Sequence, residues 1–168
     1  VSRLQRQRGA EHAAAAAEAT KQESAGRAAA EQRGDQLAET RLREAEALAE
    51  ALDDPRRLGR VSRFLSHAFS LMGAYDQAIA AGQRALALAT AGGEVVLQAL
   101  ANLGLGFTYQ HQGDYHRAID CLGQTVVALE GARRHERFGQ VQLPAVLSRA
   151  YLATCHAELG MFAEGRAF

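Results

Sequence analysis

The sequence has few residues that interrupt helices and shows little of the pattern expected for strands. It contains only two prolines, Pro55 and Pro144, and no tryptophan. Alternating runs of β-branched residues, which are typical of strands, are also absent. Helices joined by short turns that contain glycine are therefore the expected structure. We predict an all-α fold.

Cysteines and long apolar runs are equally scarce. The two cysteines, Cys121 and Cys155, both lie in helical patterns, which is typical of a chain in a reducing compartment rather than of a disulfide framework. No apolar run approaches the roughly 18 residues that cross a bilayer. The first residues do not form a secretory signal. We expect a soluble, cytoplasmic protein that does not bind membranes.

An excess of charge of one sign is missing as well. Lys plus Arg and Asp plus Glu number 19 each, so the formal net charge is zero and binding to nucleic acid is disfavoured. Phosphate-binding loops of the Walker type and Gly-x-Ser-x-Gly elbows do not occur. We therefore expect no cofactor, no catalytic residue and no enzymatic activity.

A metal site is the remaining chemical alternative. His111, His116 and Cys121 follow one another at equal spacing, and Cys155 or His156 would complete a zinc site. This spacing straddles a helical turn poorly, and Gly113 interrupts the helix between the two histidines. The favoured interpretation is exposed histidines and an ordinary thiol, with no metal bound.

What is present divides into two parts. From Gln5 to Gln36 alanine is the only strongly apolar residue type, which favours a helix but offers little area to bury. Residues 1–36 are therefore predicted to be an Ala-rich, weakly anchored helical segment. From Leu37 onward large apolar residues recur at helical spacing.

The first full helix of the second part has a clear start and a clear apolar stripe. Asp54 is a plausible N-cap, and Pro55 suits the first turn, where no amide donor is required. The predicted buried stripe then runs to Gly73 and consists of Val61, Phe64, Leu65, Ala68, Phe69 and Met72.

A repetition follows. "GAYDQAIAAG" begins at Gly73 and "GDYHRAIDCL" at Gly113, with Gly, Tyr, Ala and Ile at the same offsets and a period of about 40 residues. Gly73, Gly113 and Gly160 are predicted to end helices in a left-handed conformation, and Asp114 to cap the next helix. The pattern predicts a repeated helical hairpin. Its parts are a partial repeat at 37–54, repeats at 55–91 and 94–130, a loop at 131–144 and a truncated repeat at 145–168.

These residues resemble tetratricopeptide repeats. In "LGLGFTYQHQGDYHRAIDCLGQTVVAL" the positions that match the motif are Leu105, Gly106, Tyr109, Gly113, Asp114, Tyr115, Ala118, Leu122 and Thr125. "FLSHAFSLMGAYDQAIAAGQRALAL" matches through Leu65, Ser66, Phe69, Gly73, Tyr75, Ala78, Gly82 and Ala85, and "YLATCHAELGMFAEGRAF" through Leu152, Ala153, His156, Gly160 and Phe162. Gly82 replaces a bulky residue, which leaves room for a neighbour or a void.

The resemblance implies an α-solenoid of antiparallel hairpins with repeats longer than the common form of about 34 residues. More specifically, the region from Leu37 to Phe168 is similar to the C-terminal repeats of bacterial signalling ATPases of the STAND class, many of which carry an adenylate or guanylate cyclase domain. The implied function is a non-enzymatic module of such a signal-transduction protein that binds a protein or peptide partner.

The resemblance also implies a concave binding groove. Its positions fall on Arg63, His67 and Ser70 in one repeat and on Leu103, Phe107, Gln110 and His111 in the next. Such a surface suits an amphipathic helix or an extended peptide with some negative charge. The alternative is that Leu103 and Phe107 pack on a neighbouring helix and Arg63 is only solvated.

The loop is a second candidate surface, because long irregular connections often carry function. Its candidate binding residues are Arg134, Arg137 and Phe138. Alternatively the loop is a plain connector in which Phe138 and Leu143 tuck under the repeats. A last hypothesis is self-assembly into a homo-oligomer through Phe162 and Phe168, which the truncated final hairpin leaves without a capping helix.

Overall fold

The computed structural model describes residue 21, residue 34, residues 36–51 and residues 53–166. All regular structure in these residues is helical, which confirms the all-α prediction for this part of the chain. The chain divides into two units, Val1–Ala38 and Glu39–Phe168. The Ala-rich segment predicted at 1–36 lies almost wholly outside the described residues.

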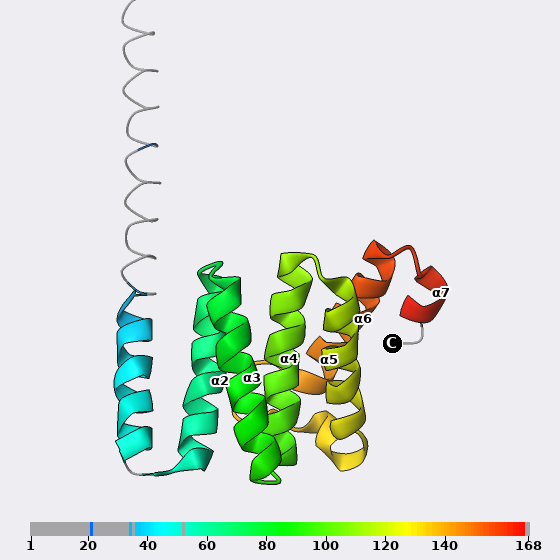
Figure 1. Cartoon of the computed structure of the whole chain (residues 1–168). Helices are drawn as coiled ribbons and strands as arrows, with labels where there is room; N and C mark the ends of the chain where they lie inside the picture. The colour runs from blue at the N-terminus through cyan, green and yellow to red at the C-terminus, as the bar shows by residue number, and fades with distance from the viewer. Residues whose placement is uncertain (1–20, 22–33, 35, 52, 167–168) are drawn as a thin grey trace, which may run out of the picture. The chain divides into compact units, whose positions relative to one another are not determined.

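The second unit is a row of helices joined by short turns and, between α5 and α6, by the longer segment 129–143 (Figure 1). After the helical residues 39–51 come α2 (Pro55–Leu71), α3 (Tyr75–Ala91), α4 (Val95–Gln112), α5 (Tyr115–Ala128), the 3₁₀ helix η1 (Gly131–His135), α6 (Pro144–Glu158) and α7 (Phe162–Gly165). Each α-helix from α2 to α6 packs against the next α-helix in the sequence.

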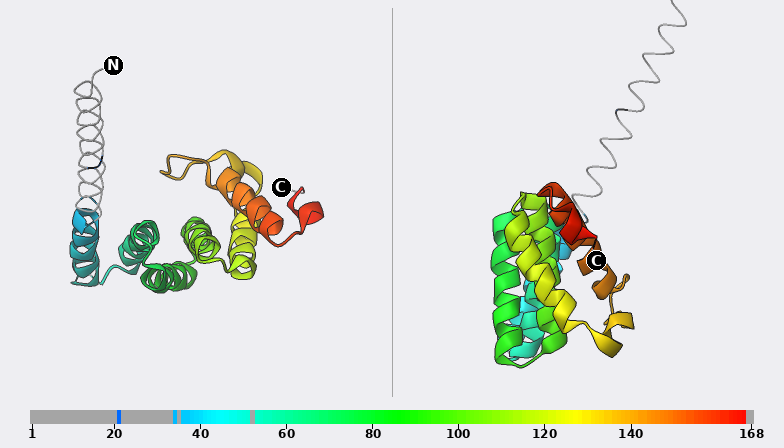
Figure 2. Two further views of the ribbon diagram at one scale, coloured as in Figure 1. Left: turned by 90° about the horizontal axis from the view of Figure 1, so that it is seen from above. Right: turned by 90° about the vertical axis from the view of Figure 1, so that its right-hand side faces the viewer.

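Alternate helices lie on the same side of this row. Seen from above, α2, α4 and α6 lie on one side and α3 and α5 on the other (left view of Figure 2). Contacts between α2 and α4 and between α4 and α6 accompany this arrangement. The connection from 129 to 143 runs on the side of α2, α4 and α6, and we call this side the inner face.

The predicted helix ends are confirmed. The side chain of Asp54 accepts a hydrogen bond from the amide of Arg57 at 3.0 Å, and Pro55 occupies the first turn of α2. Asp114 caps α5 in the same way, through the amide of Arg117 at 3.1 Å. Gly73, Gly113 and Gly160 all have positive φ angles, 75°, 86° and 73° respectively, which a glycine adopts without the strain that a Cβ would cause.

The core repeats the same three side-chain types in successive hairpins. Leu65, Phe69 and Ala78 form one cluster between α2 and α3. Leu105, Tyr109 and Ala118 belong to the corresponding cluster between α4 and α5. In both, the cluster combines an aromatic ring on the first helix with a fully buried alanine on the second, and so small a side chain lets the two helices approach closely.

Helix proximity in the second hairpin depends on Gly106. A Cβ placed on this glycine would lie 2.6 Å from Cγ of Leu122, whose side chain is fully buried. The leucine therefore occupies the space that a side chain at position 106 would need.

Ion pairs hold residues 39–51 against α3. Arg84 Nη1 lies 2.6 Å from Glu46 Oε1, and Arg84 also pairs with Glu50. Arg43 Nη1 lies 2.9 Å from the second carboxylate oxygen of Glu46. The Glu46 side chain is 12% exposed, so two arginines share a carboxylate that is largely shielded from water.

Among the described residues, no helix combines the length and the apolar character needed to cross a membrane.

Candidate functional site

The inner face carries two adjoining hollows. They share Arg63 and Phe64 of α2, Leu100 of α4 and Gln140 of the loop. The first, which we call the basic hollow, has a volume of about 510 Å³ and is further lined by Arg56, Arg60, Glu94, Val96, Leu97, Phe138 and Gly139. The second, the aromatic hollow, has a volume of about 150 Å³ and is further lined by His67, Leu103, Gly104, Phe107, Leu147 and Tyr151.

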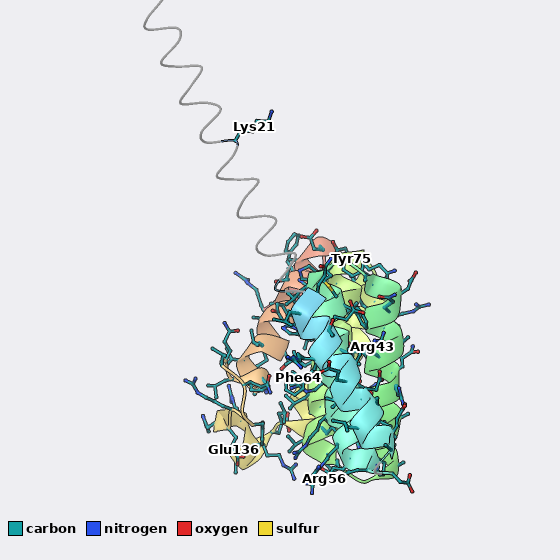
Figure 3. All side chains as sticks on the ribbon, turned by 90° about the vertical axis from the view of Figure 1, so that its left-hand side faces the viewer. Lys21, Arg43, Arg56, Phe64, Tyr75 and Glu136 are labelled. Atoms are coloured by element: carbon teal, nitrogen blue, oxygen red, sulfur yellow. The ribbon has the colours of Figure 1, made fainter. Side chains whose placement is uncertain are left out.

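Helical spacing places the α2 residues of this site on one face. Positions 56, 60, 63, 64 and 67 recur at steps of one, three and four residues, so their side chains share one stripe of the helix. Figure 3 shows this end of the unit with Phe64 and Arg56 labelled on α2 and Glu136 on the loop. The opposite stripe of α2 carries Leu65 and Phe69 into the core.

The arginines of the basic hollow differ in their partners. Arg56 Nε lies 2.7 Å from Glu94 Oε1, so this cation is neutralised within the chain. The guanidinium of Arg63 lies over the ring of Phe64, 4.0 Å from its centroid, and burial lowers the pKa of Arg63. Within the described part of the chain, neither Arg60 nor Arg63 pairs with a carboxylate.

Phe107 is the centre of the aromatic hollow. Its ring centroid lies 5.5 Å from that of Tyr151, 6.2 Å from that of His67 and 4.0 Å from that of His111. Burial lowers the pKa of His67, and the neighbouring charge of Arg63 lowers it further. His67 is therefore predominantly neutral at pH 7, and this hollow is an apolar, aromatic surface beside a cation.

The structure brings some of the sequence-predicted residues together. Arg63, His67, Leu103 and Phe107 all line the aromatic hollow, and Phe138 lines the basic hollow. Phe138 also packs against the cluster of Ala99, Leu129 and Ala145, so it is anchored in the core as well as present at the wall of the hollow.

Other predicted residues lie elsewhere. Ser70 is buried and shares a hydrogen bond with Thr108, with the two oxygens 3.2 Å apart. Gln110 is half-buried, and His111 contacts Phe107 from outside the hollow. Arg134 and Arg137 are exposed in the loop, where Arg137 donates a hydrogen bond to the carbonyl of Val141 at 2.6 Å.

Several lining residues were not among the predicted ones. Phe64 was expected in the buried stripe of α2, but 47% of its surface is exposed, because the stripe turns from the core to the inner face at this position. Arg60, Gln140 and Tyr151 were also missed. The spacing of Arg56, Arg60 and Arg63 is a signal in the sequence that would have identified the basic face of α2.

The thiols and histidines proposed for a metal site do not converge. In the described residues, no group of three or more His, Cys, Asp or Glu side chains is arranged to hold a metal ion. Burial, with a smaller contribution from the charge of Asp120, raises the pKa of the Cys121 thiol to about 11. Burial also raises the pKa of Cys155. Both sulfurs are therefore protonated at neutral pH and are weak nucleophiles.

Comparison with known proteins gives no family assignment. No protein-family model matches the chain, and no curated protein sequence matches it significantly.

Proposed function

We propose that this chain is a non-enzymatic interaction module, a tetratricopeptide-like α-solenoid that belongs to a cytoplasmic bacterial signal-transduction ATPase or cyclase. The architecture supports the proposal through the recurring cluster of leucine, aromatic residue and alanine in successive hairpins. It is also supported by the order of contacts, in which each helix packs against its sequence neighbours and alternate helices share a side. Repeats stacked in this way expose an extended face that binds partners.

The inner face is the proposed binding surface for a peptide or partner domain. The observation that carries this proposal is that α2, α4, α6 and the loop all contribute side chains to the two hollows. Phe64 and Phe107 remain partly exposed there, at the centre of a surface that also holds cations. Aromatic and arginine side chains in concave positions are the residues that contribute most to protein interfaces.

A display experiment tests the proposal. The purified 168-residue chain would be used to select binders from a phage library of random peptides, and the best peptide would be titrated into isotope-labelled protein. We expect amide shifts on α2, α4 and α6 near Phe64, Phe107 and Tyr151. Shifts confined to α3 and α5, or the absence of any binder, would contradict the proposed surface.

Elemental analysis tests the alternative chemistry. If the purified protein contained stoichiometric zinc, the metal-binding hypothesis would replace the proposal of a purely interacting module.

Self-assembly is a second candidate function. Met161 and Phe162 are adjacent in the sequence and are 37% and 68% exposed, so they form a local apolar surface at the start of α7. Analytical ultracentrifugation of the chain and of Phe162→Ser tests this candidate. A wild-type protein that stays monomeric at high concentration would remove it. Phe168, the other residue named for this role, lies outside the described residues.

A further inference from the structure

We infer that the inner face recognises a partner peptide through two anchors: an Asp or Glu carboxylate held by Arg60 and Arg63, and a large apolar side chain seated against Phe107 and Tyr151. This inference rests on the proposed function and specifies the chemistry of the partner. The two anchors correspond to the basic hollow and the aromatic hollow, which adjoin at Arg63 and Phe64.

The carboxylate anchor follows from the charge balance of the basic hollow. Glu94 is the acidic residue among those lining the two hollows, and Arg56 already pairs with it. Arg60 and Arg63 lie one turn apart on the same stripe of α2 and point to the same hollow without an acidic partner in the described residues. The hollow therefore presents positive charge that no carboxylate in the described part of the chain compensates.

Arg63 is oriented to receive such a group. One face of its planar guanidinium covers the Phe64 ring, which leaves the N–H groups at its edge to donate to a ligand. A carboxylate matches that edge with two parallel hydrogen bonds. Since Arg63 is already partly removed from water, binding an anion there requires little further desolvation of the cation.

The apolar anchor follows from the size and lining of the second hollow. Its volume of about 150 Å³ is smaller than the roughly 300–1,000 Å³ of sites that enclose a whole small molecule. It therefore suits one side chain of a longer partner. Phe107 and Tyr151 supply ring surfaces, and Leu103 and Leu147 complete an apolar lining.

A peptide fits these features better than a nucleic acid does. Binding to a phosphate backbone depends on several cations along the strand. Among the described residues, the basic hollow offers two arginines without a carboxylate partner, since Arg56 is neutralised by Glu94. The larger hollow, about 510 Å³, also has room for the main chain that would link the two anchors.

The test extends the display experiment to matched variants of the whole chain. The probes are the best selected 12-residue peptide and its versions with Glu or Asp changed to Gln or Asn, and with the large apolar residue changed to Ala. The proteins are wild type, Arg60→Gln/Arg63→Gln, Phe107→Ala, Phe107→Leu and the control Arg117→Gln. Arg117 lies on α5, is 67% exposed and carries the same charge outside the two hollows. Far-UV circular dichroism checks that each variant is folded. If Phe107→Ala is not folded, Phe107→Leu replaces it in the binding measurements.

We expect wild type to select peptides that share one acidic residue and one large apolar residue at a constant spacing. Removal of the peptide carboxylate should weaken binding to wild type and to Arg117→Gln by about 10- to 100-fold. The same change should have little effect on binding to Arg60→Gln/Arg63→Gln. Phe107→Ala should weaken binding of the selected peptide. This variant should bind the selected peptide and the peptide with Ala in place of the large apolar residue with similar affinity.

The possible failures are distinguishable. Binders that lack an acidic residue, or a carboxylate effect that is equal in wild type and in the double variant, would overturn the two-anchor inference and leave a peptide-binding module intact. A library that yields no binder at all would overturn both the inference and the proposed function.

Discussion

Gly82 in α3 lies directly beneath the side chain of Leu105 in α4. A Cβ added to Gly82 would stand 2.7 Å from Cδ2 of Leu105 and 2.9 Å from the hydroxyl of Ser66. Leu105 is 2% exposed, so it has little freedom to move aside. The space left by the glycine is therefore filled by a neighbour from the next hairpin and is not a void.

This relationship predicts opposite effects for two similar substitutions. Gly82→Ala should lower the free energy of unfolding, because the overpacking cost of about 1–3 kcal/mol outweighs the roughly 1 kcal/mol gained in helix propensity. Gly123→Ala in α5, where no atom beyond the adjoining residues and the local helix backbone lies within 4 Å of an added Cβ, should raise it by about 0.5–1 kcal/mol. Urea denaturation of both variants checks the prediction. An equal increase in stability at both positions would show that α3 and α4 are not in close contact at Gly82.

The ion pairs of Arg84 should control the anchoring of residues 39–51. Arg84→Ala removes the ion pairs that Glu46 and Glu50 make with α3. Amide hydrogen exchange should then accelerate in residues 39–51, with a loss of about 1 kcal/mol or less. Arg41→Ala is the control, because Arg41 is 73% exposed and pairs only locally with Glu44. Equal exchange rates in the two variants would contradict the anchoring role.

Cys121 should react slowly with alkylating reagents in the folded protein. Its pKa is raised to about 11, so at pH 8 the thiolate fraction is roughly 100-fold below that of a thiol with the ordinary value near 9. The unfolded thiol loses its proton at lower pH than the folded one, so this group's contribution to stability is lost as the pH rises from about 9 towards 11. Iodoacetamide labelling followed by mass spectrometry, with and without urea, checks the rates. Rapid labelling of Cys121 in the native chain would be contrary to its burial.

Arg63 should influence the titration of His67. Arg63 of α2 and Tyr151 of α6 line the same hollow as this imidazole, and the Phe107 ring of α4 lies 6.2 Å from the His67 ring and 4.0 Å from the His111 ring. Burial raises the pKa of Tyr151, so it remains uncharged over the range in which histidine titrates. Arg63→Gln removes a charge that lowers the pKa of His67, and this pKa should rise while staying depressed by burial.

The titration can be followed by NMR of the His67 ring protons in wild type and Arg63→Gln. The lowered pKa of His67 also determines the direction in which stability changes with pH. Because the folded chain binds this proton less readily than the unfolded chain, stability falls as the pH decreases below about 6.5. An unchanged His67 pKa in Arg63→Gln would mean that the two side chains do not interact.

Local chemistry made much of the fold predictable from the sequence. Asp54 and Pro55 specify the start of a helix through backbone groups a few residues away, and Gly113 specifies its turn through its own φ angle. These signals do not depend on distant parts of the chain. These helix ends could therefore be placed without knowledge of the packing.

The candidate site was less predictable because it depends on neighbours far away in the sequence. Ser70 follows the groove pattern but is buried, since Thr108 of α4 lies opposite it. Phe64 follows the core pattern but is exposed, since α6 and the loop leave a hollow in front of it. Gln140 enters both hollows only because the loop turns back at Phe138 and Gly139, which both have positive φ angles.

The walls of the basic hollow come from α2, α4 and residues 138–140 of the loop that leads to α6. A partner bound there would contact α2, α4 and the loop at the same time and would link them. Occupancy of the hollow would therefore restrict the movement of α2, α4 and this part of the loop relative to one another.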